Sequence, residues 1–336
     1  MHLFCLLPLL AFVSARNITI VTKTNSTFYA ESETKKDTIG YNFAINQNVL
    51  SVMLNATESA ENIDPVSYMI IPNLLLEYNS TENANSTDSI FGFQDKNSVV
   101  GSWGKGLSAT KYKSKALNGT ESVDVWQVRA EWSNPNAKNK KPKFNALMYF
   151  SSAATEFHGK RLSPNAINIR YSILNYPFKY QNSTLGLNEL VLSKGNIATN
   201  LFSNSTDDNG DGDYGSLRVN RTALVDGKKK HLVVDHYDGS SIDIVAGNST
   251  NIDLSEFDKQ SVLFSVRDVS GAKNVTIDQR LSLNITALRK EAEKKGNNKE
   301  ETASPNNSNK SGAPLTFMAF VIALTSVLVS LPALVL

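Results

Sequence analysis

Apolar and polar residues alternate along most of the chain, and this two-residue period is typical of half-buried β-strands. In the segment 167–173 every second residue is large and apolar, namely Ile167, Ile169, Tyr171 and Ile173. Val262, Phe264 and Val266 repeat the pattern. We therefore predict many short strands with one apolar face each.

Two local signals refine this prediction. Asp238-Gly239 separates the alternating run that ends near Val234 from another that begins at Ile242, and Asp-Gly favours a hairpin turn. Val123 and Val125 share one parity, whereas Trp126 and Trp132 share the other, which predicts a β-bulge between them. All three tryptophans, Trp103 included, are expected to be buried.

Helical periodicity is nearly absent. Residues 287–295 are good helix formers without an apolar face. The sequence therefore predicts an all-β fold, an antiparallel β-sandwich over residues 16–286 followed by a polar stalk over 287–306. One large sandwich and two stacked sandwiches stay open as alternatives, with a split near 151–164 in the second case.

The first 15 residues have the pattern of a secretory signal peptide. An apolar run fills residues 3–13, and Val13 and Ala15 are the small residues expected before a cleavage site. The single cysteine, Cys5, lies in this segment, so the mature protein is expected to lack cysteine and disulfides.

The last residues have the pattern of a glycosylphosphatidylinositol (GPI) attachment signal. An uncharged, mostly apolar tail covers 315–336 and follows a short polar stretch. We expect lipid attachment at Asn306 or Asn307, with Ser311 as the weaker candidate, and removal of the tail within 307–336. A plain C-terminal membrane helix is the alternative.

The chain contains 14 Asn-x-Ser/Thr sequons, against about six expected from its composition. The first 12 all end in Thr, although the chain has 37 Ser and 22 Thr. We predict N-glycosylation at these 12: Asn17, Asn25, Asn55, Asn79, Asn85, Asn118, Asn182, Asn204, Asn220, Asn248, Asn274 and Asn284.

A glycosylated asparagine must face water, which sets the phase of a strand that carries one. The sequons then place a set of apolar neighbours inside the fold: Ile18, Ile20, Val275, Ile277, Leu281, Leu283 and Ile285.

The two ends and the sequon density together resemble GPI-anchored surface glycoproteins of the fungal or protist type. The resemblance does not extend to the predicted sandwich. It implies a location at the outer face of the plasma membrane, reached through the secretory pathway, and implies nothing about a ligand.

Composition limits the partners. The net charge of +2 over 336 residues argues against a duplex nucleic-acid binder. Two lysine-rich segments, at 138–143 and 228–230, are candidates for contact with anionic polysaccharide or lipid headgroups. Solvated hairpin loops are the simpler interpretation of both.

One segment has the spacing of a calcium loop. Asp207, Asn209, Asp211 and Asp213 alternate around glycines, as oxygen ligands do in such loops. Arg218 stands where an EF-hand has its bidentate Glu, so the candidate is a looser Ca²⁺ site, and a solvated acidic turn is the alternative. No other cofactor is expected.

Sequence motifs for common hydrolases are missing: the chain has no G-x-S-x-G and no H-E-x-x-H. We therefore predict a non-enzymatic surface glycoprotein with a role in adhesion, recognition or surface organisation, whose partner is a cell-surface protein or polysaccharide. The alternatives are a polysaccharide-acting enzyme, which would need two converging carboxylates, and a Ca²⁺-dependent carbohydrate-binding module.

Overall fold

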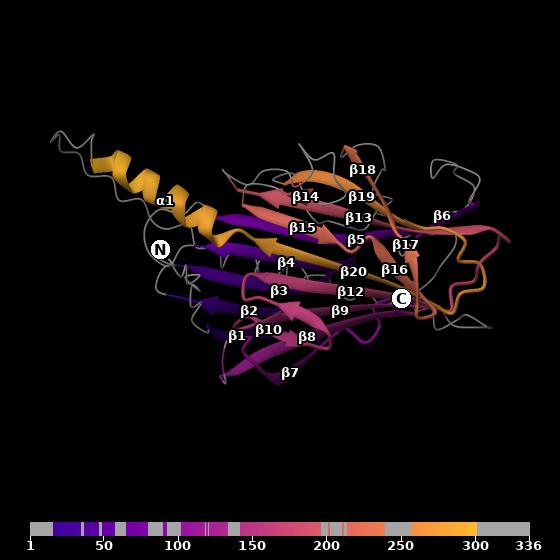
Figure 1. The fold of residues 1–336 in the computed structure, drawn as a ribbon, viewed down its shortest axis with the longest axis horizontal. Coiled ribbons are helices and arrows are strands. Elements are labelled where there is room, and N and C mark those ends of the chain that lie inside the picture. Colours follow the sequence, from indigo (N-terminus) through magenta and orange to yellow (C-terminus); the bar gives the residue numbers. More distant parts are fainter. Residues whose placement is uncertain are drawn as a thin grey trace, which may run out of the picture. The chain divides into compact units, whose positions relative to one another are not determined.

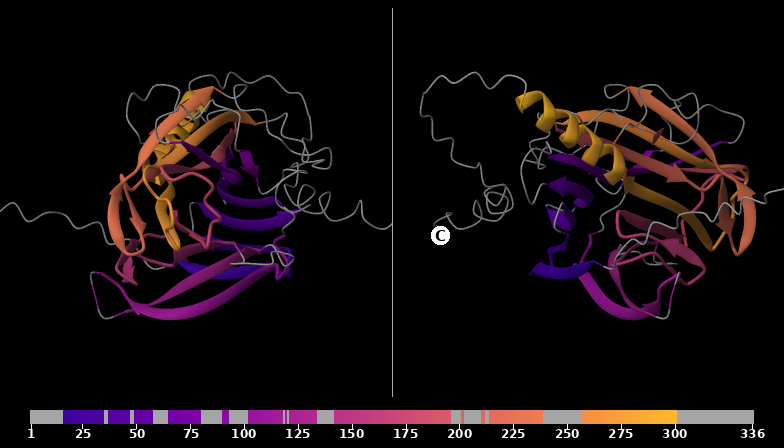
Figure 2. Two further views of the ribbon diagram at one scale, coloured as in Figure 1. Left: turned by 90° about the vertical axis from the view of Figure 1, so that its right-hand side faces the viewer. Right: turned by 60° about the vertical axis from the view of Figure 1, so that its left-hand side comes forward.

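The computed structural model describes residues 16–34, 37–46, 49–57, 65–79, 90–92, 102–117, 119, 121–133, 142–195, 201, 210–211, 214–238 and 257–300. Two nine-stranded antiparallel sheets face each other across one hydrophobic core, as Figure 2 shows with the purple strands in one layer and the yellow-orange strand before the helix in the other. The predicted β-sandwich is confirmed.

The first sheet contains, in spatial order, β1 (Asn17–Lys23), β2 (Thr27–Glu33), β3 (Thr38–Asn46), β4 (Val49–Thr57), β5 (Val66–Asn79), β13 (Ser183–Lys194), β19 (Asp258–Val266) and β18 (Val233–Asp238), with β6 (Ile90–Gly92) beside β5.

The second sheet contains β14 (Gly210–Asp211), β15 (Gly215–Val219), β20 (Asn274–Leu283), β12 (Ala166–Leu174), β9 (Lys143–Ser151), β8 (Ser122–Ser133) and β7 (Leu107–Lys115), with β16 (Thr222–Val225) pairing with β20 and with β17 (Lys228–His231). The short hairpin of β10 (Thr155–Phe157) and β11 (Lys160–Leu162) forms a separate two-stranded sheet, and β20 leads into the helix α1 (Ile285–Glu300) (Figure 1).

The core is built from the alternating residues that the sequence marks. Ile167, Ile169, Tyr171 and Ile173 are buried, and so are Val262, Phe264 and Val266. Aromatic rings join the two layers: Phe150 of β9 stacks on Tyr41 of β3 with ring centroids 4.3 Å apart. Trp103, Trp126 and Trp132 are buried in the same cluster, as predicted.

The predicted bulge in β8 is wrong. β8 pairs in unbroken register with β7 and β9 through Val125 and Trp126. Both parities are buried because both faces of the sheet are covered there. Trp126 faces the main core, whereas Val125 packs on the other side in a small cluster with Tyr149 and Leu162 of β11.

The segment 151–164 is not a boundary between two sandwiches. It contains the β10–β11 hairpin, and the strands on either side of it, β9 and β12, are direct neighbours in the second sheet. The compact unit that includes both sheets extends to Gly296, so this part of the chain has its own complete core.

The first turn of α1 belongs to this unit. Leu288 is buried in the main core, and the guanidinium of Arg289 pairs with the carboxylate of Asp37. The expected stalk therefore cannot start at residue 287, because the first turn of the helix packs on the sandwich. Among the described residues, no helix has the length and apolarity needed to cross a bilayer.

Candidate functional site: a cationic cleft on the second sheet

Three neighbouring strands give the outer face of the second sheet its chemistry. β20 lies between β12 and β15, and its residues 278, 280 and 282 point away from the core because Ile277, Gln279 and Leu281 point into it. The register forms three rows across the strands. Arg170 lies opposite Asp278, Arg280 lies between Asn168 and Arg218, and Ser282 lies opposite Ser216.

The β10–β11 hairpin adds two more cations at the edge of this face. Its two-residue turn, His158-Gly159, has φ values of 51° and 69°, the positive values that a type I′ hairpin turn requires. The tight turn fixes the position of the following residues, Lys160 and Arg161, which line the same hollow as Arg170, Arg218 and Arg280.

Two hollows of about 410 and 630 Å³ share Arg218 as a lining residue. We call the two together the cationic cleft. The smaller contains the five cations just named, and the larger adds Arg16 and Arg289. Among the described residues that line them, Asp278 is the one carboxylate.

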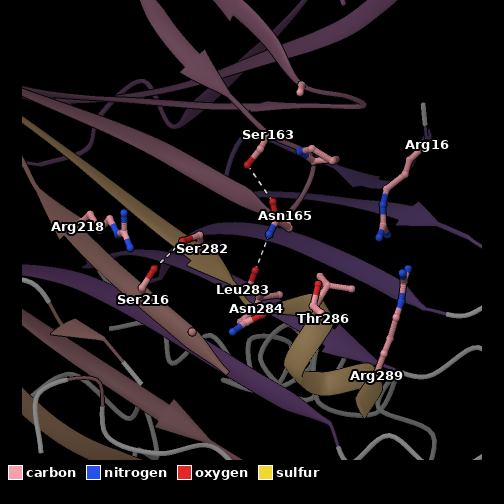
Figure 3. A pocket seen from close by; sticks show the side chains of 14 residues that line it. Arg16, Ser163, Asn165, Ser216, Arg218, Ser282, Leu283, Asn284, Thr286 and Arg289 are labelled. Carbon is pink, nitrogen blue, oxygen red and sulfur yellow. Dashed lines mark hydrogen bonds between the residues drawn. The ribbon is translucent and has the colours of Figure 1, made fainter. Parts of the chain in front are cut away.

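Figure 3 shows the larger hollow: Arg16 and Arg289 point toward each other at one end, and Arg218 lies at the other beside Ser216 and Ser282. The wall between them is held by neutral hydrogen bonds. The Nδ2 of Asn165 donates to the carbonyl of Leu283 at 2.5 Å, and the hydroxyls of Ser216 and Ser282 lie 2.8 Å apart.

Asp278 is fully ion-paired. It accepts hydrogen bonds from the Nε and Nη2 of Arg170, both at 2.8 Å, and from the Nζ of Lys160 at 2.5 Å. Burial alone would raise the pKa of this carboxyl, but the hydrogen bonds and charges of Arg170 and Lys160 hold it below its ordinary value. Asp278 is therefore a charged anchor for its two neighbours.

Arg280 has the opposite environment. Its pKa is lowered first by burial and then by the positive charges of Arg218 and Arg161. Its Nη2 donates to the hydroxyl of Ser163 at 2.5 Å, whereas its buried Nε has no hydrogen-bond partner among the described residues. Like charges directly opposite each other destabilise a sheet, so this row keeps an arrangement that costs stability.

The far end of the cleft is again compensated. The Nη1 of Arg16 lies 2.7 Å from the Oδ1 of Asp37, with side chains 5% and 2% exposed, and the Nε of Arg289 lies 2.9 Å from Oδ2. Burial would raise the pKa of Asp37, but the charges and hydrogen bonds of Arg16 and Arg289 lower it. Arg16 is the expected first residue of the mature chain, and its backbone nitrogen donates to the carbonyl of Ser152 at 2.8 Å.

A buried carboxylate lies behind the cleft, inside the sandwich. Glu189 of β13 is 0% exposed, and both of its oxygens accept from the Nε2 of Gln279, at 2.9 and 3.0 Å. Burial raises the pKa of Glu189 to about 7, against the opposing hydrogen bonds from Tyr171 and Gln279.

Eight of the 12 Thr sequons lie in the described residues. Asn17, Asn25, Asn182, Asn220 and Asn284 are exposed, and Asn79 and Asn274 are half-buried. Asn284 also caps α1, because its Oδ1 accepts from the backbone nitrogen of Ala287 at 3.1 Å. A glycan is attached through Nδ2, so the cap and a glycan are compatible. The predicted phase of β1 and β20 agrees with this placement: Val275, Ile277, Leu281 and Leu283 are buried, and Ile18 and Ile20 pack on the core. Ile285 also packs on the core, but from the helix and not from a strand.

Asn55 is the exception. Its side chain is 3% exposed and lies over Gly40 of β3, where even a methyl group would come within 2.3 Å of its Oδ1. The expectation that every sequon asparagine faces water therefore fails at Asn55.

The remaining predicted sites lie outside the described residues: Asn85, Asn118, Asn204, Asn248, Asn306, Asn307, Asp207, Asn209 and Asp213. Asp211 lies in β14, and its side chain is not described. Within the described part of the chain no three His, Cys, Asp or Glu residues cluster as metal ligands would. The calcium loop stays a prediction.

The lysine segments can be followed in part. Lys143 pairs with Glu131 at 3.2 Å. The Nζ of Lys230 donates to the backbone carbonyl of Asp268 at 2.5 Å, while Lys228 and Lys229 are exposed. The cleft itself was not found from the sequence, because it needs β12, β15, β20 and the β10–β11 hairpin to be neighbours. The chain matches no protein-family model, and no curated protein sequence matches it.

Proposed function

We propose that this chain is a GPI-anchored, N-glycosylated glycoprotein at the outer face of the plasma membrane, with a non-enzymatic role in adhesion, recognition or surface organisation. The observation that carries the proposal is the placement of the described Thr sequons: seven of the eight asparagines are exposed or half-buried, at strand ends and turns of the sandwich. The signal-like start and the GPI-like tail support the location.

The chemistry of the cleft favours recognition over hydrolysis. A glycosidase-type mechanism needs a carboxylic acid whose pKa is raised, with a second carboxylate nearby. The carboxyl of Asp278 has a lowered pKa and is held by two cations, which suits an anchor and not a proton donor. A surface enzyme and a Ca²⁺-dependent module stay as alternatives.

The test expresses the full chain in cells and measures two things. Phosphatidylinositol-specific phospholipase C should release the protein from the surface, and a matched variant that ends at residue 306 should appear directly in the medium. Retention of the full chain after treatment would contradict the lipid anchor.

Mass spectrometry of the released protein should find glycans at Asn17, Asn182 and Asn220. Asn55 should be unmodified, because its side chain has no room for a sugar in the folded protein. A chain without glycans at the exposed positions would remove the main support for the proposal.

A further inference from the structure

We propose that the cationic cleft binds an acidic carbohydrate, and that Arg218 and Arg280 together hold one of its oxyanion groups, a sulfate, a carboxylate or a phosphate ester. This inference rests on the recognition role proposed above, and it adds the class of ligand and the site.

The first support is uncompensated positive charge at a fixed place. Arg218 and Arg280 lie directly opposite each other in the register of β15 and β20, and Arg161 adds a third charge close to them. Asp278, two residues away on β20, is already engaged by Lys160 and Arg170. An oxyanion between the two guanidinium groups would supply the missing negative charge and a partner for the buried Nε of Arg280.

The second support is the neutral surface around these arginines. Hydroxyl and amide groups line the two hollows on either side of the central row, from Ser163, Asn165, Asn168, Ser216 and Ser282. The outward positions of β20 from 278 to 284 span about 20 Å at the rise of an extended strand. A long, polar, hydrogen-bonding surface with cations at intervals fits an extended chain of charged sugars.

The same surface does not fit a lipid bilayer. Membrane-surface binding needs apolar side chains that can enter the headgroup region beside the cations. Among the described residues the large apolar side chains that are exposed are Val21 and Leu117, and neither lines the cleft.

The glycan sites leave this row accessible. Asn220 directly follows β15 and Asn284 directly follows β20, so the two sequons lie at opposite ends of the ladder between these strands. Sugars attached there would leave from the two ends, with Arg218 and Arg280 between them.

The test uses the soluble protein from residue 16 to 305, which includes the whole compact unit, with its own glycans attached. Calorimetric titration compares a heparin-derived hexasaccharide, an oligogalacturonate that carries carboxylates alone, a phosphorylated mannose oligosaccharide and a neutral dextran of similar length. Inorganic sulfate and vesicles rich in phosphatidylserine are the other two probes.

We expect at least one acidic oligosaccharide to bind and the dextran not to bind, with an affinity that falls as salt rises. Arg280→Gln and Arg218→Gln should each weaken binding about tenfold, the usual effect of losing one charge-assisted contact. The matched control, Lys228→Gln, removes one exposed charge outside the cleft and should leave the affinity unchanged. Because Arg218 is exposed, its variant keeps the test valid if Arg280→Gln folds poorly.

Equal binding by the arginine variants and the Lys228→Gln control would overturn the proposal. So would binding to the vesicles alone, binding of inorganic sulfate with no gain for any oligosaccharide, or no binding at all. Phospholipase release and glycan occupancy are scored separately, so a released, glycosylated protein that binds no acidic sugar overturns this inference and leaves the proposed function standing.

Discussion

Asp278 and Glu189 lie on opposite sides of β20, and the protein treats these two carboxyl groups in opposite ways. Asp278 faces the cleft between two cations, and its pKa is lowered. Glu189 lies in the core against Gln279, without a cation, and burial raises its pKa to about 7. Charge on the outer face is therefore held by pairing, whereas charge in the core is avoided by keeping the proton.

Asp37 separates these two causes, because it is as buried as Glu189 and as well paired as Asp278. Its pKa is lowered, so pairing decides the outcome and burial does not. The cleft contains one position that this rule leaves unbalanced, the row of Arg218 and Arg280, and that row is where we place a ligand.

The largest effect is expected at Asp37. Asp37→Asn removes the charge that compensates the buried guanidinium of Arg16, and loss of one partner of a buried pair costs about 3–5 kcal/mol. Urea unfolding measures the change, with Arg289→Gln as the control. Arg289 is 39% exposed, so losing it should cost about 1 kcal/mol or less. Equal losses in the two variants would contradict the role of burial.

Glu189 should make the protein less stable as the pH rises. The folded state keeps its proton up to pH about 7, whereas the unfolded chain loses it near its ordinary value of 4.5. The contribution of this group is therefore complete below pH 4.5 and is lost as the pH rises through 7, about 3 kcal/mol in all.

Glu189→Gln should remove this pH dependence and be the more stable protein at pH 8, because a neutral amide replaces the neutral acid. Denaturant titrations at a series of pH values test it. Parallel curves for the two proteins between pH 4.5 and 8 would show that Glu189 is not the titrating group.

Asp278→Asn should cost about 2 kcal/mol at pH 7, since two cations lose their charged acceptor. The sign with pH is opposite to that of Glu189. The lowered pKa means that the contribution is present above the ordinary value of 3.8 and is lost as the pH falls below it. Asp258→Asn, at an exposed position of β19, is the control and should change stability by less than about 0.5 kcal/mol.

The smallest effect on stability is expected from Arg218→Gln, about 0.5 kcal/mol in the stabilising direction, because it relieves the repulsion with Arg280. The same variant should lose affinity for acidic sugar, so stability and binding move in opposite directions. A variant that loses both would mean that Arg218 supports the fold instead of the ligand.

Much of the sandwich could be predicted from the sequence because strand periodicity is local. Residues 167–173 and 262–266 fix their own inner face by alternation, and the sequons at Asn17 and Asn274 fix the outer one. The method failed in β8, where both faces are covered: Val125 and Trp126 are both apolar because different partners bury them, not because the strand bulges.

The cleft could not be predicted, although its residues stand in plain view in the sequence. Arg170, Arg218 and Arg280 are far apart along the chain, and only the register of three strands brings them together. An outward arginine on a strand is ordinary by itself. The signal lies in the pairing of two arginines across strands, which depends on long-range topology. The position of Leu288 and Arg289 was missed for a similar reason, since a distant residue, Asp37, decides where the helix packs.

The most direct test of the account is a crystal structure of residues 16–305 with the tightest-binding acidic oligosaccharide. The account predicts an oxyanion group within hydrogen-bond reach of both Arg218 and Arg280, while Asp278 stays paired with Lys160 and Arg170. An oligosaccharide bound elsewhere, at Lys228 and Lys229 for example, with the central row of the cleft unoccupied, would contradict it.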